Sequence, residues 1–262
     1  MTIISRASFL VRQTVSDLSD SPERSGAIQT VSLSFFRFSR GIDRLWALTM
    51  MGAARLALPK VPDIGFWKLL GSGTGEGFTP IPNTGVYAIL AVWPDAATAR
   101  KQTETAPIFG RYRTRATESW TLFLSPTSAR GHWSGEAPFQ ITSPASTGPL
   151  AALTRATVHP RKALQFWRRV PDISAVIGAD PNVAFKIGVG EVPFLHQVTF
   201  SIWPDAQSMT AFARHDGPHA RAIAAVRDGD WFREELYARF RVIGDHGTWG
   251  GTSPLTHIKG QI

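Results

Sequence analysis

The sequence predicts an α+β fold in which two ferredoxin-like halves, each with the element order β-α-β-β-α-β, form one dimeric-α+β-barrel-like unit in a single chain. The first observation is a repeat, because Val86–Asp95 (VYAILAVWPD) recurs as Gln197–Asp205 (QVTFSIWPD). The second is that each copy follows a strand and a Trp-bearing amphipathic helix. The third is that the strand of the first copy, at 86–93, is apolar on both of its alternating faces. We therefore expect a tandem duplication.

The elements of the two halves are expected at corresponding places along the chain. In each half, a first strand leads to a helix that carries Trp46 or Trp167. Asp95 and Asp205 are expected to cap the second helices, because a carboxylate accepts from the free N–H groups of a helix start. The expected strands are 30–38, 66–73, 86–93 and 120–124, then 151–158, 185–190, 197–203 and 237–243, with the first helices at 42–58 and 161–177.

The two-sided apolar character of the strand at 86–93 predicts how the halves associate. An antiparallel sheet with one wet face alternates apolar and polar residues, and this strand does not. We therefore expect helices on one face of each sheet and the other half's sheet on the opposite face. Two independent domains on a linker are the alternative, and they would leave these faces in water. The expected organisation is a mobile extension (1–28), the first half (29–133), a linker (134–149), the second half (150–249) and a tail (250–262).

Composition restricts the chemistry and the partners. The chain has no Cys, which excludes thiolate nucleophiles, Fe–S clusters and thiolate-ligated haem. Its net charge is +8, but the basic residues are scattered and form no nucleic-acid motif, so an anionic lipid surface is the favoured partner and nucleic acid is not expected. No apolar run reaches the length of a membrane span. A cytoplasmic protein follows, either soluble or in peripheral contact with a membrane.

Aromatic residues are abundant, with 16 Phe and 9 Trp. Such an interior suits a large flat or conjugated ligand, although an aromatic-rich core is the simpler interpretation. Gly71–Gly77 lacks the lysine and the spacing of a nucleotide-binding loop, so we interpret it as a loop between the second and third strands. His215 and His219 are four residues apart, but Gly217 and Pro218 between them argue against a zinc site.

His219 is the strongest candidate for a metal ligand. Pro218 suits the first position of a helix, which puts His219 in its first turn on an otherwise apolar face. The positive helix end favours the neutral imidazole that an axial iron ligand requires. A half-buried His that donates to a backbone carbonyl is the alternative. His196, which begins a strand and shares a face with Val198, is the second choice.

Four cations are expected to face the interior or its ends. Lys68 and Lys186 are predicted at matching strand positions of the two halves, and Arg37 and Arg155 near the ends of the two first strands. A basic group inside an apolar barrel needs an anionic partner. Haem propionates or an internal Asp or Glu would both serve.

A family resemblance extends from Gln29 to about Trp249. Its residues resemble those of the spheroidene monooxygenase family, the acyclic-carotenoid 2-ketolases of purple phototrophic bacteria. The motifs that carry the resemblance are Arg44–Trp46, Phe66–Lys68, Gly71–Gly75, Gly77–Pro80, Leu90–Asp95, Ala152–Thr157, Val183–Phe194, Gln197–Asp205, Asp216–His219, Trp231 and Glu234–Phe240.

The resemblance implies oxygen insertion at C-2 of acyclic carotenoids, of the spheroidene-to-spheroidenone type, through successive hydroxylations. It also implies haem b, O2 and an external donor such as reduced ferredoxin. The resemblance does not itself supply the haem ligand, but His219 lies within one of its motifs, Asp216–His219, and is also the ligand candidate that the residues favour. Non-haem iron held by His and carboxylates remains the alternative cofactor. A non-redox haem- or carotenoid-binding carrier and a peroxide- or chlorite-decomposing barrel enzyme are the alternative functions.

Overall fold

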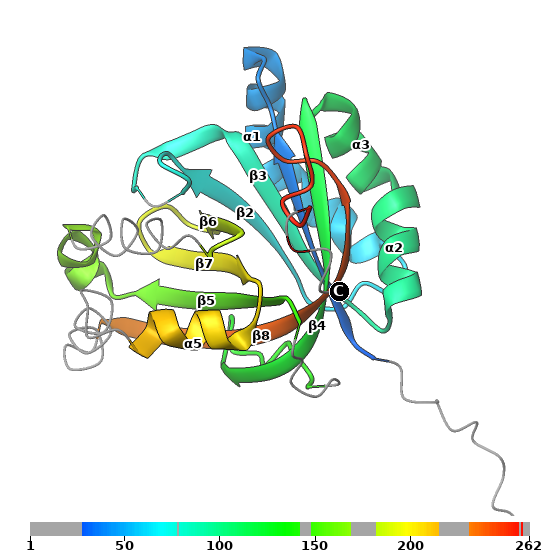
Figure 1. Cartoon of the computed structure of the whole chain (residues 1–262). Helices are drawn as coiled ribbons and strands as arrows, with labels where there is room; N and C mark the ends of the chain where they lie inside the picture. The colour runs from blue at the N-terminus through cyan, green and yellow to red at the C-terminus, as the bar shows by residue number, and fades with distance from the viewer. Residues whose placement is uncertain are drawn as a thin grey trace, which may run out of the picture.

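The computed structural model describes residues 28–77, 79–141, 148–168, 182–214, 231–256 and 258. In this part of the chain, eight antiparallel strands form a closed barrel, with helices on its outside (Figure 1). The strands are β1 (Thr30–Arg37), β2 (Trp67–Gly73), β3 (Pro82–Trp93), β4 (Glu118–Gly131), β5 (Leu150–Val158), β6 (Phe185–Gly190), β7 (His196–Trp203) and β8 (Phe232–Gly247). The helices are α1 (Gly41–Ala57), α2 (Ala96–Thr105), α3 (Pro107–Arg115) and α5 (Ala206–Arg214), with 3-10 turns η1 (Leu58–Lys60) and η2 (Pro160–Lys162).

The strand order around the barrel is β1-β3-β2-β6-β7-β5-β8-β4. The four strands of each half are therefore contiguous, in the equivalent orders β2-β3-β1-β4 and β6-β7-β5-β8. The halves meet at two junctions of unequal length. β4 and β8 pair from Trp120 to Gly131, whereas β2 and β6 pair only at Gly71 with Gly190 and at Ser72 with Val189. The predicted α+β barrel with one shared interior is confirmed.

One apolar cluster fills the barrel and draws on all eight strands. Alternation within β3 shows how this happens, because Ala88 and Leu90 face the interior while Ile89 and Trp93 pack under helices α1, α2 and α3. This is the two-sided burial that the sequence of 86–93 predicts. Two aromatic-rich cores, one inside the barrel and one under the first half's helices, therefore share a single sheet.

The strand-to-helix corners form as predicted. Asp95 accepts a hydrogen bond from the backbone N–H of Thr98 (2.7 Å) at the start of α2, and Asp205 accepts one from Ser208 (2.7 Å) at the start of α5. A proline after each strand end prevents the ladder from continuing, and the carboxylate then satisfies a free N–H of the helix. The repeated Trp-Pro-Asp is thus a structural corner in both halves.

Two expectations about element bounds need correction. The two overlapping expectations, a strand at 66–73 and a loop at 71–77, are resolved in favour of the strand. The loop begins only at Thr74, because Gly71–Gly73 continue β2 by pairing with β3 and β6. The closing strands are longer than 120–124 and 237–243, since β4 and β8 pair with each other beyond each half's own sheet. Of the helix expected at 161–177, residues 169–177 lie outside the described part of the chain, as does residue range 1–27.

A close approach of two glycines ties the halves together at the short junction. Gly188 on β6 donates its N–H to the carbonyl of Glu76 (2.7 Å), and a Cβ on Gly188 would lie 2.3 Å from the carbonyl oxygen of Gly77. We expect Gly188→Ala to lower the free energy of unfolding by about 2–3 kcal/mol, because backbone atoms of the other half would have to move.

Urea unfolding followed by tryptophan fluorescence measures this effect. Gly110→Ala in α3 is the matched control, because a Cβ there meets nothing within 4 Å and alanine is the better helix former. The control should be neutral or stabilised by up to about 1 kcal/mol. Equal stability of Gly188→Ala and the natural chain would contradict the close approach.

Candidate functional site

A charged cluster closes one end of the barrel interior and joins the two halves. Glu191, which follows β6, accepts a hydrogen bond from the indole of Trp133 (2.7 Å), and its other carboxylate oxygen lies 3.2 Å from Nζ of Lys68 on β2. Arg155 of β5 places Nη2 3.8 Å from Glu191 and donates from Nη1 to Glu234 of β8. We call these five residues the interior cluster.

Burial explains why the interior cluster contains carboxylates. The Arg155 side chain is 1% exposed, and the fully buried Trp133 ring lies beside it, 5.7 Å from the guanidinium carbon. An unpaired guanidinium in such a place would cost several kcal/mol in lost hydration. Glu191 and Glu234 offset that cost by supplying two negative charges. The cluster is therefore a paired structural network at the wall of the interior.

The titratable residue His196 lies beside the interior cluster. It begins β7, and its Nδ1 lies 3.5 Å from the Glu191 carboxylate. Burial lowers the pKa of His196, Glu191 opposes that effect and Arg155 adds to it, so the pKa lies below its ordinary value. The imidazole is thus held neutral near pH 7, despite the adjacent carboxylate.

Each half caps a glutamate of the other half. Glu234 accepts hydrogen bonds from the backbone N–H groups of Ser134 (3.0 Å) and Gly135 (2.7 Å), in the turn that follows β4. Glu118 at the start of β4 accepts one from Gly251 (2.7 Å), in the turn that follows β8. Burial alone would raise the pKa of Glu234, but these backbone donors together with Arg155 hold the pKa below its usual value. The pKa of Glu118 is lowered in the same way.

Arg37 and Arg155 pair with these equivalent glutamates from different depths. Arg37 lies directly opposite Glu118 in the strand register, whereas Thr157 is the residue opposite Glu234. Arg155 therefore sits two residues further into the barrel, a step of about 7 Å along a strand. This step explains why the Arg155 side chain is 1% exposed and that of Arg37 is 39% exposed.

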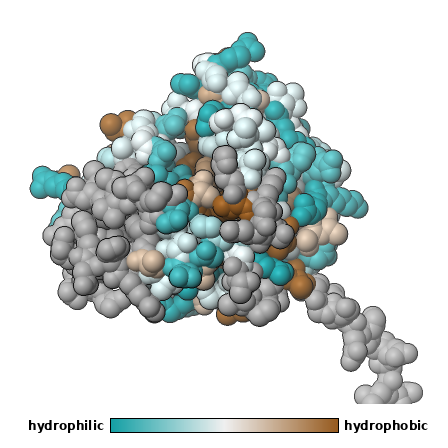
Figure 2. Space-filling model, viewed as in Figure 1, coloured by the Kyte–Doolittle hydropathy of each residue, from teal (hydrophilic) through white to brown (hydrophobic). Residues whose placement is uncertain are grey.

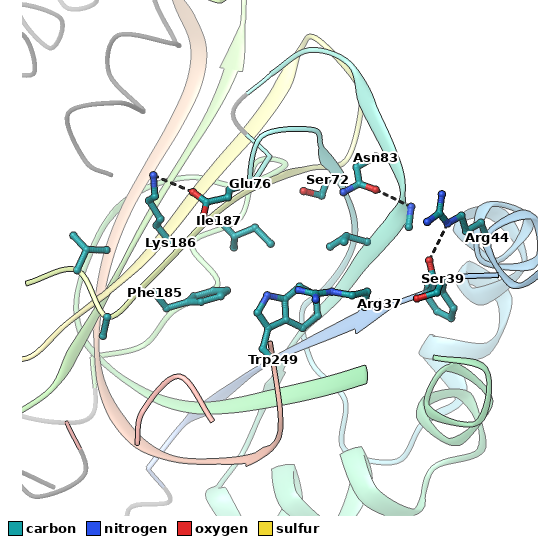
Figure 3. A pocket seen from close by; sticks show the side chains of 15 residues that line it. Arg37, Ser39, Arg44, Ser72, Glu76, Asn83, Phe185, Lys186, Ile187 and Trp249 are labelled. Atoms are coloured by element: carbon teal, nitrogen blue, oxygen red, sulfur yellow. Dashed lines mark hydrogen bonds and ion pairs between the residues drawn. The ribbon is translucent and has the colours of Figure 1, made fainter. Parts of the chain in front are cut away.

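The shallower arginine borders an open pocket of about 530 Å³ between the two halves. Arg37 lies over the ring of Trp249, 4.2 Å from its centroid. Phe185 of β6 lies on the other side of the pocket from Arg37, with the Trp249 ring between them in the view of Figure 3. Lys186 reaches from β6 to Glu76, with 3.0 Å between Nζ and Oε2. We call this space the junction pocket. It exists because β2 and β6 diverge after only two paired positions.

Two aromatic residues that line the junction pocket, Phe185 and Trp249, contact the buried rings of Phe35 and Trp120, which do not line it. Phe185 lies 4.8 Å from Trp120 and 5.6 Å from Phe35 between ring centroids, and Phe35 lies 5.8 Å from Trp249. Figure 2 shows hydrophobic residues at several separate places on the face that it draws, one of them near the middle of the molecule. A ligand entering here would meet cations at the rim and aromatic rings inside.

The outer face of the second half's sheet differs from that of the first. Where β3 presents Tyr87, Ile89 and Trp93 to the helices, the corresponding face of β5 and β7 carries small side chains. Ala152 pairs with Ser201 and Thr154 with Thr199 across these strands, and Ala156 pairs with Gln197. We call these six residues the small-residue face.

Apolar clusters border the small-residue face at both ends. Val158, Phe166 and Trp231 lie at one end, and Leu150, Trp203 and Met209 at the other. The buried Nε2 of Gln197 has no hydrogen-bond partner among the described residues. The small-residue face is therefore bordered by large apolar side chains and carries one buried amide nitrogen without a described partner.

The sequence-predicted site residues are not gathered in one place. Lys68 and Arg155 belong to the interior cluster with His196 beside it, whereas Arg37 and Lys186 border the junction pocket. His219 lies outside the described residues. Each of the four cations has a glutamate partner, which is the internal pairing that the sequence left open beside haem propionates.

The predicted equivalence of the two lysines is wrong. Lys68 shares the interior face of β2 with Leu70, whereas Lys186 lies between Phe185 and Ile187, whose side chains face the interior. Lys186 therefore points away from the interior. The repeat is loose here, and one residue separates Phe66 from Lys68 while none separates Phe185 from Lys186, which reverses the side of the sheet.

Sequence reasoning missed the glutamates. Glu118, Glu191 and Glu234 hold the arginines and the lysine in place, yet none was predicted as a site residue. One signal was available, because a buried cation requires a carboxylate partner. Choosing the partner required the register between strands distant in sequence, which no local pattern contains.

The described residues contain no group of three or more His, Asp or Glu positioned to hold a metal ion. Among these same residues, no helix has the length and apolar character needed to cross a membrane.

Comparison with solved structures defines the class of the fold. Two aldoxime dehydratase structures superpose with TM-scores of 0.59 and 0.55 at 11% identity, covering 90% and 82% of this chain and 86% and 82% of theirs. One of them is a complex with butyraldoxime. At this identity the likeness establishes a shared α+β barrel fold. No protein-family model matches the chain.

Sequence relatives then define the family. The chain is 56% identical to spheroidene monooxygenase of Cereibacter sphaeroides over 87% of its length and 71% of the relative's, and 51% identical to that of Rhodobacter capsulatus over 86% and 94%. A third relative, from Rubrivivax gelatinosus, is 34% identical over 79% and 80%. The chain belongs to the spheroidene monooxygenase family, and it is a monooxygenase.

Removing the charge of Glu234 should destabilise the barrel in a pH-dependent way. Because the folded-state pKa of Glu234 is lowered, its carboxylate contributes stability above the ordinary glutamate pKa, and this stability is lost as pH falls through the folded pKa. We expect Glu234→Gln to cost about 3 kcal/mol at pH 7, since Arg155 is left partly unpaired. The cost should shrink below about pH 4.5.

Urea unfolding between pH 3 and pH 8 measures this difference. Glu235→Gln on the same strand is the matched control, because Glu235 is exposed. A pH-independent cost, or an equal cost for the two variants, would contradict the buried pairing.

His196 should also make the free energy of unfolding depend on pH, but at a higher pH than Glu234 does. A His whose folded pKa is lowered resists protonation in the folded state, so the unfolded chain takes up the proton first as pH falls below about 6.5. We expect His196→Gln to lessen the fall in stability below pH 6.5, compared with the natural chain. The exposed His132→Gln should leave the profile unchanged, and a flat profile in the natural chain would refute the assignment.

Proposed function

We propose that this monooxygenase inserts oxygen at C-2 of acyclic carotenoids such as spheroidene, through successive hydroxylations that end in a ketone. The observation that carries the proposal is 56% identity with an enzyme named for spheroidene over 87% of the chain. The proposed cosubstrates are O2 and an electron donor protein, reduced ferredoxin or a similar carrier.

We propose haem b as the cofactor, lying against the small-residue face with His219 as the axial ligand. Alanine, serine and threonine side chains at Ala152, Ser201 and Thr154 leave room for a planar macrocycle, which the aromatic face of the first half would not. The bordering apolar clusters and the unsatisfied Gln197 amide support this placement. Haem would supply the oxygen activation that no amino-acid side chain provides.

One cation lies at each side of the small-residue face, Lys186 on β6 and Arg239 on β8, and we propose that they pair with the haem carboxylates. Lys186 is in register with Ser201, and Ala152 is in register with Arg239 on the other side, so these four residues form one row across the sheet. Lys186 lies on the same side of β6 as this face and also lines the junction pocket. The proposed cofactor surface and the pocket are therefore adjacent.

The junction pocket is the proposed place for one end of the carotenoid. Phe185, Ile187 and Trp249 in its lining suit an apolar conjugated chain, and Arg37 and Lys186, which also line it, would stay in contact with water. Lys186 separates the pocket from the small-residue face, so a substrate end held in the pocket lies next to the proposed cofactor surface.

Two further proposals follow from the barrel. We propose that its two halves arose by tandem duplication, supported by the equivalent strand orders and by the matching glutamates Glu118 and Glu234.

We also propose a cytoplasmic protein in peripheral contact with an anionic membrane, supported by the net charge of +8 and by the apolar substrate class.

A turnover assay tests the proposed function. The purified full chain with spheroidene in detergent, O2 and reduced ferredoxin should give C-2-oxygenated products and a haem Soret band. His219→Ala should lose at least 100-fold in turnover together with the Soret band, whereas the exposed His132→Ala should keep both. Bound carotenoid without any oxygenated product would support a carrier instead, and turnover by an iron-loaded but haem-free protein would support non-haem iron.

Filling the small-residue face should prevent haem uptake. Thr154→Phe places a ring where the macrocycle is proposed to lie, and we expect at least tenfold weaker haem binding with little change in urea stability. Thr127→Phe on β4 is the control for the same substitution on another strand. Unchanged haem titration of Thr154→Phe, followed by absorbance, would exclude this face as the cofactor surface.

A further inference from the structure

Helix α1 carries an apolar stripe on its outside. Its inner face packs on the barrel through Ala47, Met50 and Ala54, which are buried. On the opposite face, Ile42, Leu45, Leu48 and Leu56 are 60%, 58%, 52% and 75% exposed. These four make up nearly half of the ten large hydrophobic residues that are exposed in the described part of the chain, so the stripe is a concentrated surface feature.

The stripe is continuous along the helix. At 100° per residue, Ile42, Leu45 and Leu56 fall within one third of the helix circumference, and Leu48 lies at its border. Gly52 falls inside the same sector, and a Cβ there would meet nothing within 4 Å. The middle of the stripe is therefore flat and open, with no neighbouring element of the described chain covering it.

Between residues 40 and 63, four exposed cations stand against one exposed anion, Asp63. Arg40, Arg44, Arg55 and Lys60 lie exposed along α1 and at its ends. Asp43 is the acidic residue of α1, and it is buried and paired with Arg40 and Arg115. The exposed surface of the helix thus combines aliphatic side chains with positive charge.

We infer that the α1 stripe is a docking surface for an anionic lipid bilayer. A helix with an apolar face flanked by Lys and Arg lies in the headgroup region with its aliphatic side chains among the acyl chains. Phosphate groups of anionic lipids neutralise the flanking cations, and each such cation strengthens binding by about fivefold. A second copy of the chain fits less well, because self-association through this face would bring like charges together.

The location of α1 beside the junction pocket connects membrane docking with substrate entry. This step rests on the proposed carotenoid function. The residues that lead into the helix, Phe38 and Ser39, and Arg44 in its first turn, line the junction pocket. In Figure 3 the Arg44 side chain extends from the helix at one end of this pocket. A bilayer in contact with α1 therefore lies next to the pocket mouth, so an apolar polyene can pass from lipid to protein with little exposure to water.

Vesicle cosedimentation tests the inference with the full chain. The protein should bind vesicles of phosphatidylglycerol and phosphatidylcholine at least tenfold more tightly than vesicles of phosphatidylcholine alone. The double variant Leu45→Ser/Leu56→Ser should bind the anionic vesicles at least tenfold more weakly, because burying one leucine changes binding by about tenfold or more. Leu164→Ser is the matched control, since Leu164 is 68% exposed on the second half and should not affect binding.

Gly52→Leu adds apolar area at the open centre of the stripe without a clash, and it should tighten vesicle binding by about fivefold to tenfold. Unchanged vesicle binding in both stripe variants would overturn the inference. A dimer in light scattering that the double variant dissociates, without any effect on vesicles, would overturn it in favour of self-association.

Turnover separates this inference from the proposed function. With spheroidene in detergent the double variant should turn over as the natural chain does, and with spheroidene in anionic vesicles it should turn over at least tenfold more slowly. Equal rates of the two proteins in vesicles would overturn the docking role. Absence of turnover by the natural chain in detergent would overturn the proposed function, while vesicle binding would still decide the docking surface.

Discussion

The rest of the structure depends on one constraint. The turn that follows the last strand of each half donates hydrogen bonds to a glutamate of the other half. The turn after β4 caps Glu234 of the second half, and the turn after β8 caps Glu118 of the first. Each glutamate is paired with an arginine of its own half, but its backbone donors come from the closing turn of the other half. A buried or half-buried carboxylate without those donors would be costly. Each arginine in turn depends on a glutamate that the other half holds in place. Folding of one half is thereby coupled to the presence of the other.

Within this symmetric frame the halves have different surfaces. The first sheet carries large aromatic and aliphatic side chains under α1, α2 and α3, whereas the second carries the small-residue face. A two-residue difference in arginine position leaves one glutamate pair sealed by Trp133 and the other beside an open pocket. The first half thus has a packed aromatic core and an exposed helix, while the second half and the junction carry the surfaces that we propose for ligands. One barrel can therefore keep a filled interior and still present a site.

Much of this architecture could be predicted from the sequence, and the limits are physical. The repeat around Trp93 and Trp203 fixed the strand-to-helix corners and the two-sided sheet, because these depend on local alternation and capping. The partners of Arg37 and Arg155 depend on register between strands about 80 residues apart, which local pattern does not contain. The inner and outer positions of Lys68 and Lys186 were misjudged for a related reason, since a one-residue offset in a loose repeat reverses the face.

Native-state hydrogen exchange tests the coupling of the halves most directly. Amides of Leu33 in β1 and Leu153 in β5 would be followed as guanidinium chloride is raised within the folded range. The interlocked barrel predicts that both amides exchange through the same global unfolding, with one free energy and one denaturant slope. Separate free energies for β1 and β5, with one half opening while the other stays protected, would contradict it.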